Sequence, residues 1–95
     1  MTVTIAGIDF EHHHYDSRGD VLYLSTERYD VTRLPPASYS TPEGHNVEYD
    51  ESGRVIGLVL VNVKWLLERD RELKITWPAG HLTPDELAPA LVSAA

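Results

Sequence analysis

Hydrophobic and polar residues alternate along much of the chain in the way that is typical of β-strands. The segment HNVEYD predicts a strand with Val47 and Tyr49 on one face and Glu48 on the other. In the segment RVIGLVLV the residues after Arg54 are apolar on both faces, which predicts a central strand covered on both sides, by a helix or by a second subunit. Within it, Gly57 would let another group approach the backbone closely. Strands are predicted at 3–8, 10–15, 21–26, 45–50, 54–61 and 72–77.

Two ten-residue segments share a spacing: YDSRGDVLYL at 15–24 and YDESGRVIGL at 49–58. Each predicts a strand, a tight turn and a second strand. The side chains of Asp16 and Asp50 are expected to accept hydrogen bonds from N–H groups of the turns. Gly19 and Gly53 are expected to adopt the positive φ that such turns require. The spacing therefore predicts two hairpins of similar design.

Two helices are predicted between and after these strands. Asn62 is expected to N-cap a short helix over 63–69. The segment TPDELAPALVSA carries a capping box formed by Thr83 and Glu86, which predicts a C-terminal helix over about 83–94. The apolar residues of the second helix, Leu87 and Leu91, form one stripe that could pack on the sheet or dock on a partner.

The segment at 30–44 contains three prolines and several small polar residues, which predicts a long loop that includes Tyr39. Together these patterns predict a single α+β domain spanning residues 1–95. Its core is a mainly antiparallel sheet of four to six strands built from hairpins, with a short helix after the central strand and a helix at the C-terminus. Because sheet edges and an apolar central strand invite association, a homodimer is expected.

The overall charge narrows the range of partners. The chain of 95 residues has a formal net charge of −7, and its first 50 residues hold nine acidic and three basic side chains. Such a surface disfavours binding to nucleic acid phosphates and favours a small basic protein partner. No apolar run approaches the roughly 18 residues of a membrane span, and the first residues do not resemble a secretory signal. With no cysteines, the composition is typical of a cytoplasmic bacterial protein.

Three consecutive histidines in FEHHHYD are the residues most suggestive of chemistry. In a strand, His12 and His14 would share a face with Phe10, while His13 and Tyr15 would lie on the other. His12 and His14 could then bind a divalent transition metal, with a third ligand from Asp16, His45 or His81. The alternatives are a half-exposed strand with His13 beside Tyr15, and a pH-sensitive interface.

Catalysis is not predicted, and no catalytic residue is assigned. The sequence contains no nucleophile elbow, P-loop or dinucleotide-binding fingerprint. The acidic pair formed by Asp16 and Asp20 falls in a turn, which accounts for both residues structurally.

The hairpin motifs resemble those of the domain of unknown function 2283 family, over residues 11–65. In that family a Tyr-Asp pair, a turn, an Asp and an aliphatic-aromatic strand precede an aliphatic-Asp-Tyr-Asp-x-x-Gly-Arg-aliphatic stretch that ends in Asn. The matching positions are Tyr15, Asp16, Asp20, Leu22, Tyr23, Leu24, Tyr49, Asp50, Gly53, Arg54, Val55, Ile56, Gly57 and Asn62. His13 departs from the pattern, since the family usually has an aliphatic residue there. The resemblance implies an antitoxin-like role, because members often lie beside genes for small toxins, and it implies no catalytic residues.

The leading hypothesis is therefore a protein-interaction domain that binds a small basic protein and needs no cofactor. The candidate contact residues are Tyr39, Glu48, Leu87 and Leu91. The alternative hypothesis is a metal- or small-ligand-binding domain that uses His12 and His14.

Overall fold

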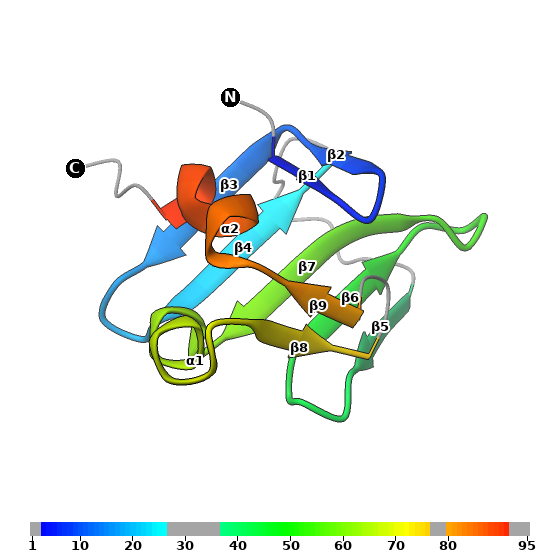
Figure 1. Ribbon diagram of the computed structural model, residues 1–95. Helices are drawn as coiled ribbons and strands as arrows, with labels where there is room; N and C mark the ends of the chain where they lie inside the picture. The colour runs from blue at the N-terminus through cyan, green and yellow to red at the C-terminus, as the bar shows by residue number, and fades with distance from the viewer. Residues whose placement is uncertain (1–2, 27–36, 77–79, 92–95) are drawn as a thin grey trace.

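The computed structural model describes residues 3–26, 37–76 and 80–91, and within them the chain forms nine strands and two helices (Figure 1). The strands are β1 (Val3–Ile5), β2 (Ile8–Phe10), β3 (His12–Asp16), β4 (Val21–Ser25), β5 (Ala37–Ser40), β6 (Asn46–Tyr49), β7 (Val55–Val61), β8 (Leu73–Ile75) and β9 (Gly80–Leu82). The helices are α1 (Val63–Asp70) and α2 (Pro84–Leu91). The predicted mainly antiparallel α+β class is confirmed.

Five of the strands form the central antiparallel sheet, in the order β3-β4-β7-β6-β5. The strand β7 lies in the middle, as its apolar sequence predicts, and pairs with β4 and β6. The hairpins β1-β2 and β8-β9 form two further two-stranded sheets. Both small hairpins and α2 lie on the same face of the central sheet, with α1 beyond one end of β7 (Figure 1).

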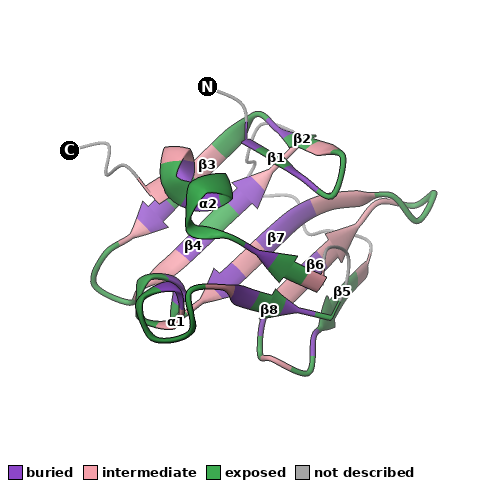
Figure 2. Cartoon of the chain, in the orientation of Figure 1, coloured by how far each residue is buried: buried purple, intermediate pink, exposed green. Residues whose placement is uncertain are grey.

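The hydrophobic core fills the space between the central sheet and this covering layer (Figure 2). Alternate residues of β4 and β7 point into it, so that Leu22, Leu58 and Leu60 have no exposed surface. The covering elements contribute side chains that are equally buried, among them Phe10, Leu73, Ile75, Leu82 and Leu87. On β7 the intervening residues Val59 and Val61 are only half-buried. No described helix covers this second face of β7, so of the two covers that the sequence allowed there, a helix is not found among the described residues and a second subunit stays a prediction.

The N-terminal strands differ from the prediction. Residues 3–8 form two strands instead of one, because Ala6 and Gly7 adopt positive φ angles of 54° and 76° and make a tight hairpin turn. The predicted strand at 10–15 is also broken, at Glu11. Phe10 ends β2 and is buried in the core, so it does not share a face with His12, which begins β3 and is exposed.

Three other boundaries change. Tyr39 lies on β5, where the prediction placed a loop, because residues 37–40 pair with β6; residues 27–36 lie outside the described part. The strand β9, which the sequence did not predict, pairs with β8. The C-terminal helix is described as far as Leu91, and the rest of the predicted helix lies outside the described residues.

The N-terminus of α1 is capped from another part of the chain. Asn62 is in the left-handed region with φ of 54° and its side chain makes no capping hydrogen bond, so the predicted role of Asn62 is wrong. The Asp20 carboxylate accepts the N–H groups of Lys64 at 2.9 Å and Trp65 at 3.1 Å instead. A left-handed residue directs its side chain away from the first helical turn, whereas the β3-β4 turn brings Asp20 to it. For α2 the predicted capping box is confirmed, since Glu86 N–H donates to the Thr83 hydroxyl at 3.3 Å.

In the two hairpin turns the aspartates have the same role, but the glycines differ in backbone conformation. Asp16 accepts the Arg18 N–H at 3.0 Å, and Asp50 accepts the Ser52 and Arg54 N–H groups, as predicted. Gly53 has the expected positive φ, of 85°. Gly19 does not, because the first turn is one residue longer and places Asp20 in the left-handed region at φ of 55°. A side chain at position 19 would instead crowd Asp16, whose Oδ2 would lie 3.3 Å from the added Cβ.

No helix in the described part of the chain has the length and apolar character needed to cross a bilayer.

Candidate functional site

The face of the central sheet opposite the covering layer is the main candidate site, and no described element packs on it (Figure 1). We call it the open face. Its side chains stand in two cross-strand rows, because paired residues of neighbouring strands point to the same side. One row is His12, Ser25, Gly57 and Glu48, and the next is His14, Tyr23, Val59 and Asn46.

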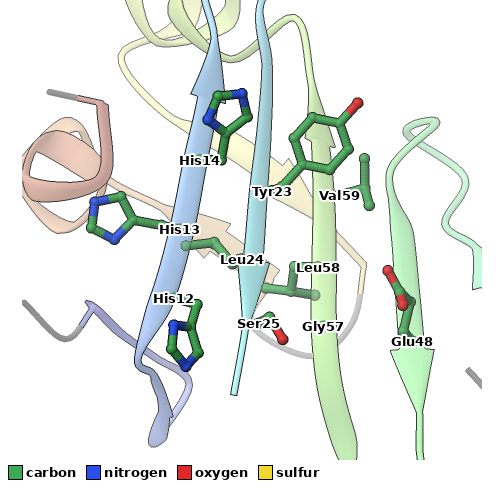
Figure 3. Close-up of a pocket in the computed structure, with 10 residues that line it drawn as sticks. All are labelled: His12, His13, His14, Tyr23, Leu24, Ser25, Glu48, Gly57, Leu58 and Val59. Atoms are coloured by element: carbon green, nitrogen blue, oxygen red, sulfur yellow. The ribbon is translucent and has the colours of Figure 1, made fainter. Parts of the chain in front are cut away.

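The open face contains a hollow of about 380 Å³ lined by residues of β3, β4, β6 and β7 (Figure 3). Tyr23 lines it and has 44% of its surface exposed. The His14 ring stacks against Tyr23, with centroids 6.2 Å apart and planes at 28°. The floor of the hollow is apolar, formed in part by the half-buried Val59.

Gly57 allows Glu48 to lie across this floor. A Cβ atom added to Gly57 would lie 3.2 Å from Cδ of Glu48, closer than ordinary contact distance. The expectation that Gly57 permits a close approach is therefore confirmed, and the approaching group is the Glu48 side chain. The carboxylate is held at one end of the row that begins with His12.

The histidine run divides between the two faces. His12 and His14 are exposed on the open face, whereas His13 points to the other side, toward α2 (Figure 3). His13 shares that face with the buried Tyr15, and its Nδ1 atom is buried with no hydrogen-bond partner among the described residues. The predicted alternation of the three histidines is thus confirmed.

The proposed third metal ligands do not gather at His12 and His14. Asp16 is hydrogen-bonded within its own turn. His45 is buried, and its Nδ1 accepts the Val61 N–H at 3.1 Å. His81 lies on β9, in the covering layer, and is paired with Glu72. Within the described residues no group of three or more His, Cys, Asp or Glu side chains is arranged to hold a metal ion.

A second surface lies at the far edge of the sheet, and we call it the β5 edge. It is a shallow groove lined by Ala37, Tyr39, Tyr49, Asp50, Glu51 and Gly53. Tyr39 is 58% exposed and meets Tyr49 edge-to-face, with ring centroids 5.7 Å apart. Hydrogen bonds from Ser52 and Arg54 lower the pKa of Asp50, so this carboxyl stays ionised at neutral pH. Glu51 beside it is exposed. The groove therefore combines aromatic rings with acidic groups.

Beneath the β5-β6 hairpin lies a polar cluster that sequence reasoning missed. Burial lowers the pKa of His45, and the backbone of Lys74 and the carboxylate of Glu43 oppose this effect. Glu43 accepts hydrogen bonds from the Thr76 hydroxyl and N–H, which lower its pKa to about 2. These contacts join the hairpin to the end of β8. The sequence offered no signal for this cluster, because its two halves, at 43–45 and at 74–76, lie about 30 positions apart along the chain.

The four candidate contact residues do not form one surface. Glu48 lies on the open face and Tyr39 on the β5 edge. Leu87 has no exposed surface, and Leu91 is half-buried against the core. Leu87 is therefore a packing residue, and its prediction as a contact residue is wrong. The stripe of α2 packs on the sheet side of the molecule, which is the first of the two uses that the sequence left open.

The two ends of the first row on the open face carry an imidazole and a carboxylate. His12 and Glu48 are three strand spacings apart, roughly 14 Å, so they cannot act on one atom within a single chain. The chain matches no family model, no curated protein and no solved structure in comparisons with known proteins. The function proposed for it therefore depends on its own geometry and charge.

Proposed function

We propose that this protein is an interaction domain, without enzymatic activity, that binds a small basic protein along the β5 edge. The observation that carries the proposal is that β5 is the last described strand of the sheet and carries an exposed tyrosine. No strand in the described part of the chain pairs with the outer side of β5, and Tyr39 stands beside it, 58% exposed. Such an edge offers N–H and C=O groups to an added strand of a partner.

The side chains around this edge favour a basic partner. Lysine and arginine side chains bind to tyrosine faces through cation–π contacts and to carboxylates through charge-assisted hydrogen bonds. Tyr39 and Tyr49 supply the rings, and Asp50 and Glu51 supply the carboxylates. The net charge of −7 would steer a basic protein toward this surface and repel nucleic acid.

The sequence motifs suggest which biological role such an interaction would serve. The resemblance to the domain of unknown function 2283 family supports an antitoxin-like role for a cytoplasmic protein that needs no cofactor. A homodimer belongs to the same proposal, because a five-stranded sheet with two edges and a face that no described element covers favours self-association.

The basic partner can be tested by affinity capture from the cells that produce the protein, with a tag that contains no histidine. The native protein is compared with a Tyr39→Ala, Glu51→Lys variant and with a Trp65→Ala control. Trp65 is a suitable control because it is 54% exposed but lies on α1. We expect the native protein and the control to retain a stoichiometric small basic protein and the double variant to lose it.

The captured partner is then purified and titrated against all three proteins, so that the comparison does not depend on the cell extract. Equal affinity for the native protein and the double variant would exclude the β5 edge. A partner that is acidic, or the absence of any stoichiometric partner, would contradict the function itself.

A second candidate function is binding of a divalent transition metal by His12 and His14. It is supported by their exposure on the same face of β3, two residues apart (Figure 3). The test is a calorimetric titration of the protein with zinc and with nickel, which measures the dissociation constant of each metal. We expect micromolar or tighter binding that a His12→Ala, His14→Ala variant loses and a His81→Ala control keeps. Weak binding that survives the double substitution would show that these histidines are not a metal site.

A further inference from the structure

We propose that two copies of this chain associate through their open faces, around a two-fold axis that runs parallel to the strands between β4 and β7. The result is a two-layered sandwich in which each copy covers the hollow of the other. The inference rests on the proposed self-association but not on the proposed basic partner, which would bind at the β5 edge.

The register of the sheet determines which residues would meet. Rotation about an axis between β4 and β7 places β4 of one copy over β7 of its partner, and β3 over β6. It preserves position along the strands, so each row faces the same row of the other copy. The row that starts at His12 ends at Glu48, and its middle members are Ser25 and Gly57. Each copy therefore places His12 opposite the other copy's Glu48.

This juxtaposition is chemically complementary. An imidazole N–H can donate to a carboxylate, and the two-fold axis makes the contact occur twice. Within one chain the same two side chains are too far apart to meet. Glu48 is half-buried and extends along the floor of the hollow over Gly57, so its carboxylate is held on the face rather than directed away from it.

The centre of the proposed interface is complementary in shape. In the second row Tyr23 of one copy faces Val59 of the other, and this contact is also repeated by symmetry. Tyr23 is the large exposed side chain on this face, whereas Val59 lies on the floor of the hollow beside Gly57, which has no side chain. A protruding ring thus meets a recess. His14 faces Asn46 at the end of the row.

The dimensions of packed sheets allow these contacts. Facing sheets in sandwiches lie about 10 Å apart and cross at about 30°. A histidine and a glutamate together span that distance once the Glu48 side chain turns from the floor of the hollow toward the partner. His12 and Glu48 lie about one and a half strand spacings, roughly 7 Å, from the axis, where such a crossing shifts facing positions by roughly 4 Å, about one residue, which two long side chains can bridge.

The test is a charge exchange measured by sedimentation equilibrium. His12→Glu places Glu opposite Glu48 at two symmetric positions, and we expect the dimer dissociation constant to rise about tenfold or more. Glu48→Lys alone should also weaken the dimer, because it removes the acceptor of the His12 N–H. The double variant, His12→Glu with Glu48→Lys, restores opposite charges and should return the constant to within about threefold of the native value. Trp65→Glu adds the same charge outside the open face and should change little.

The possible outcomes test two claims separately: that the protein forms a dimer, and that the dimer forms through the open face. A monomeric native protein would contradict both. A dimer that His12→Glu leaves unchanged, or that the double variant fails to restore, would exclude this interface while leaving self-association through another surface in place. Circular dichroism of each variant verifies that the fold is kept. As a second measurement, Tyr23→Glu should dissociate the dimer, and a native-like constant for that variant would also overturn the proposed interface.

Discussion

The carboxylate of Asp20 joins the β3-β4 hairpin to α1, which lies 44 residues further along the chain. It accepts the Tyr15 hydroxyl at 2.6 Å as well as the N–H groups of Lys64 and Trp65. These hydrogen bonds lower the pKa of Asp20 against the opposing effect of its burial. On the other side, burial and the contact with Asp20 raise the pKa of Tyr15 to about 12. One residue therefore fixes the β3-β4 turn against the start of α1.

Replacing Asp20 should destabilise the protein through this cap. We expect Asp20→Ala to lower the free energy of unfolding by about 2 kcal/mol, since it removes a charged helix cap. Asn62→Gly is the matched control, because glycine accepts the left-handed φ at that position and no capping bond is lost. Urea denaturation of the two variants measures the difference. A larger loss for Asn62→Gly than for Asp20→Ala would contradict the assignment of the cap.

Protonation of His45 should destabilise the fold. Nδ1 must be unprotonated to accept the Val61 N–H, and both nitrogens of a charged imidazole are donors. Because burial lowers the pKa of His45 in the folded state, the unfolded chain takes up its proton at higher pH. The stabilising contribution is therefore complete above the ordinary pKa of 6.5 and is lost as pH falls below it.

The variant His45→Asn tests this pH dependence, because an amide oxygen can accept the same N–H but does not titrate. We expect the free energy of unfolding of the native protein to fall between about pH 7.5 and about pH 5, and that of His45→Asn to fall less. The comparison concerns the slope with pH, since the smaller side chain lowers stability at every pH. Parallel slopes would show that His45 does not contribute.

The helix α2 was predicted correctly from the sequence, but the sequence did not decide whether its apolar stripe packs on the sheet or binds a partner. The capping box and the apolar stripe predict the helix and its buried side, and both are present. The stripe alone could equally have docked on a partner. The contacts of α2 with β1 and β3 decide the matter, because they cover Leu87 completely.

Truncation of the two leucines of α2 should therefore cost stability rather than partner binding. We expect Leu87→Ala to lower the free energy of unfolding by about 3 kcal/mol and the half-buried Leu91→Ala by about 1 kcal/mol. Chemical denaturation measures both values. If Leu87→Ala left stability unchanged but abolished capture of the basic partner, the packing role of α2 would be wrong.

The strand β5, in contrast to α2, was not predicted from the local sequence. Its residues follow two prolines and precede a third, so composition predicts a loop. Pairing with β6 makes residues 37–40 a strand, and this pairing depends on the adjacent hairpin more than on the propensity of the segment. The turn at Ala6 and Gly7 escaped prediction for a related reason, since alanine seldom adopts a positive φ.

At the scale of the whole molecule, charge would favour the complex with a basic partner, whereas shape would favour the homodimer. Each chain carries a net charge of −7, so two copies repel each other, whereas a basic partner is attracted. The open face would join two copies mainly through Tyr23 and Val59, which are not charged. The β5 edge would bind its partner through carboxylates and aromatic rings.

Salt should therefore affect the two associations in opposite directions. Raising the ionic strength from about 0.01 M to about 0.15 M shortens the screening length from roughly 30 Å to roughly 8 Å. We expect the dimer to become tighter, because repulsion between the copies is screened, and the complex with the basic partner to become weaker. Sedimentation equilibrium and calorimetric titration over this range measure the two constants. A dimer that weakens with salt as strongly as the heterocomplex would indicate an interface held mainly by ion pairs.

The sequence by itself determined the features that depend on neighbouring residues. The strands at 21–26 and 54–61, the aspartates of both hairpin turns, the capping box at Thr83 and the division of the histidines between two faces all follow from local hydrogen bonding and side-chain periodicity. Short-range geometry is repeated in any chain with these residues, so the pattern predicts it.

Only the tertiary structure decided which of these surfaces remain exposed. Both small hairpins and α2 fold onto one face, so no described element covers the other face, where pairing brings His12, Gly57 and Glu48 into one row. It also brings Asp20 to α1 and Glu43 to Thr76 across separations of 44 and 33 residues. Such contacts depend on how elements pack around a common core, and no periodicity along the chain encodes that arrangement.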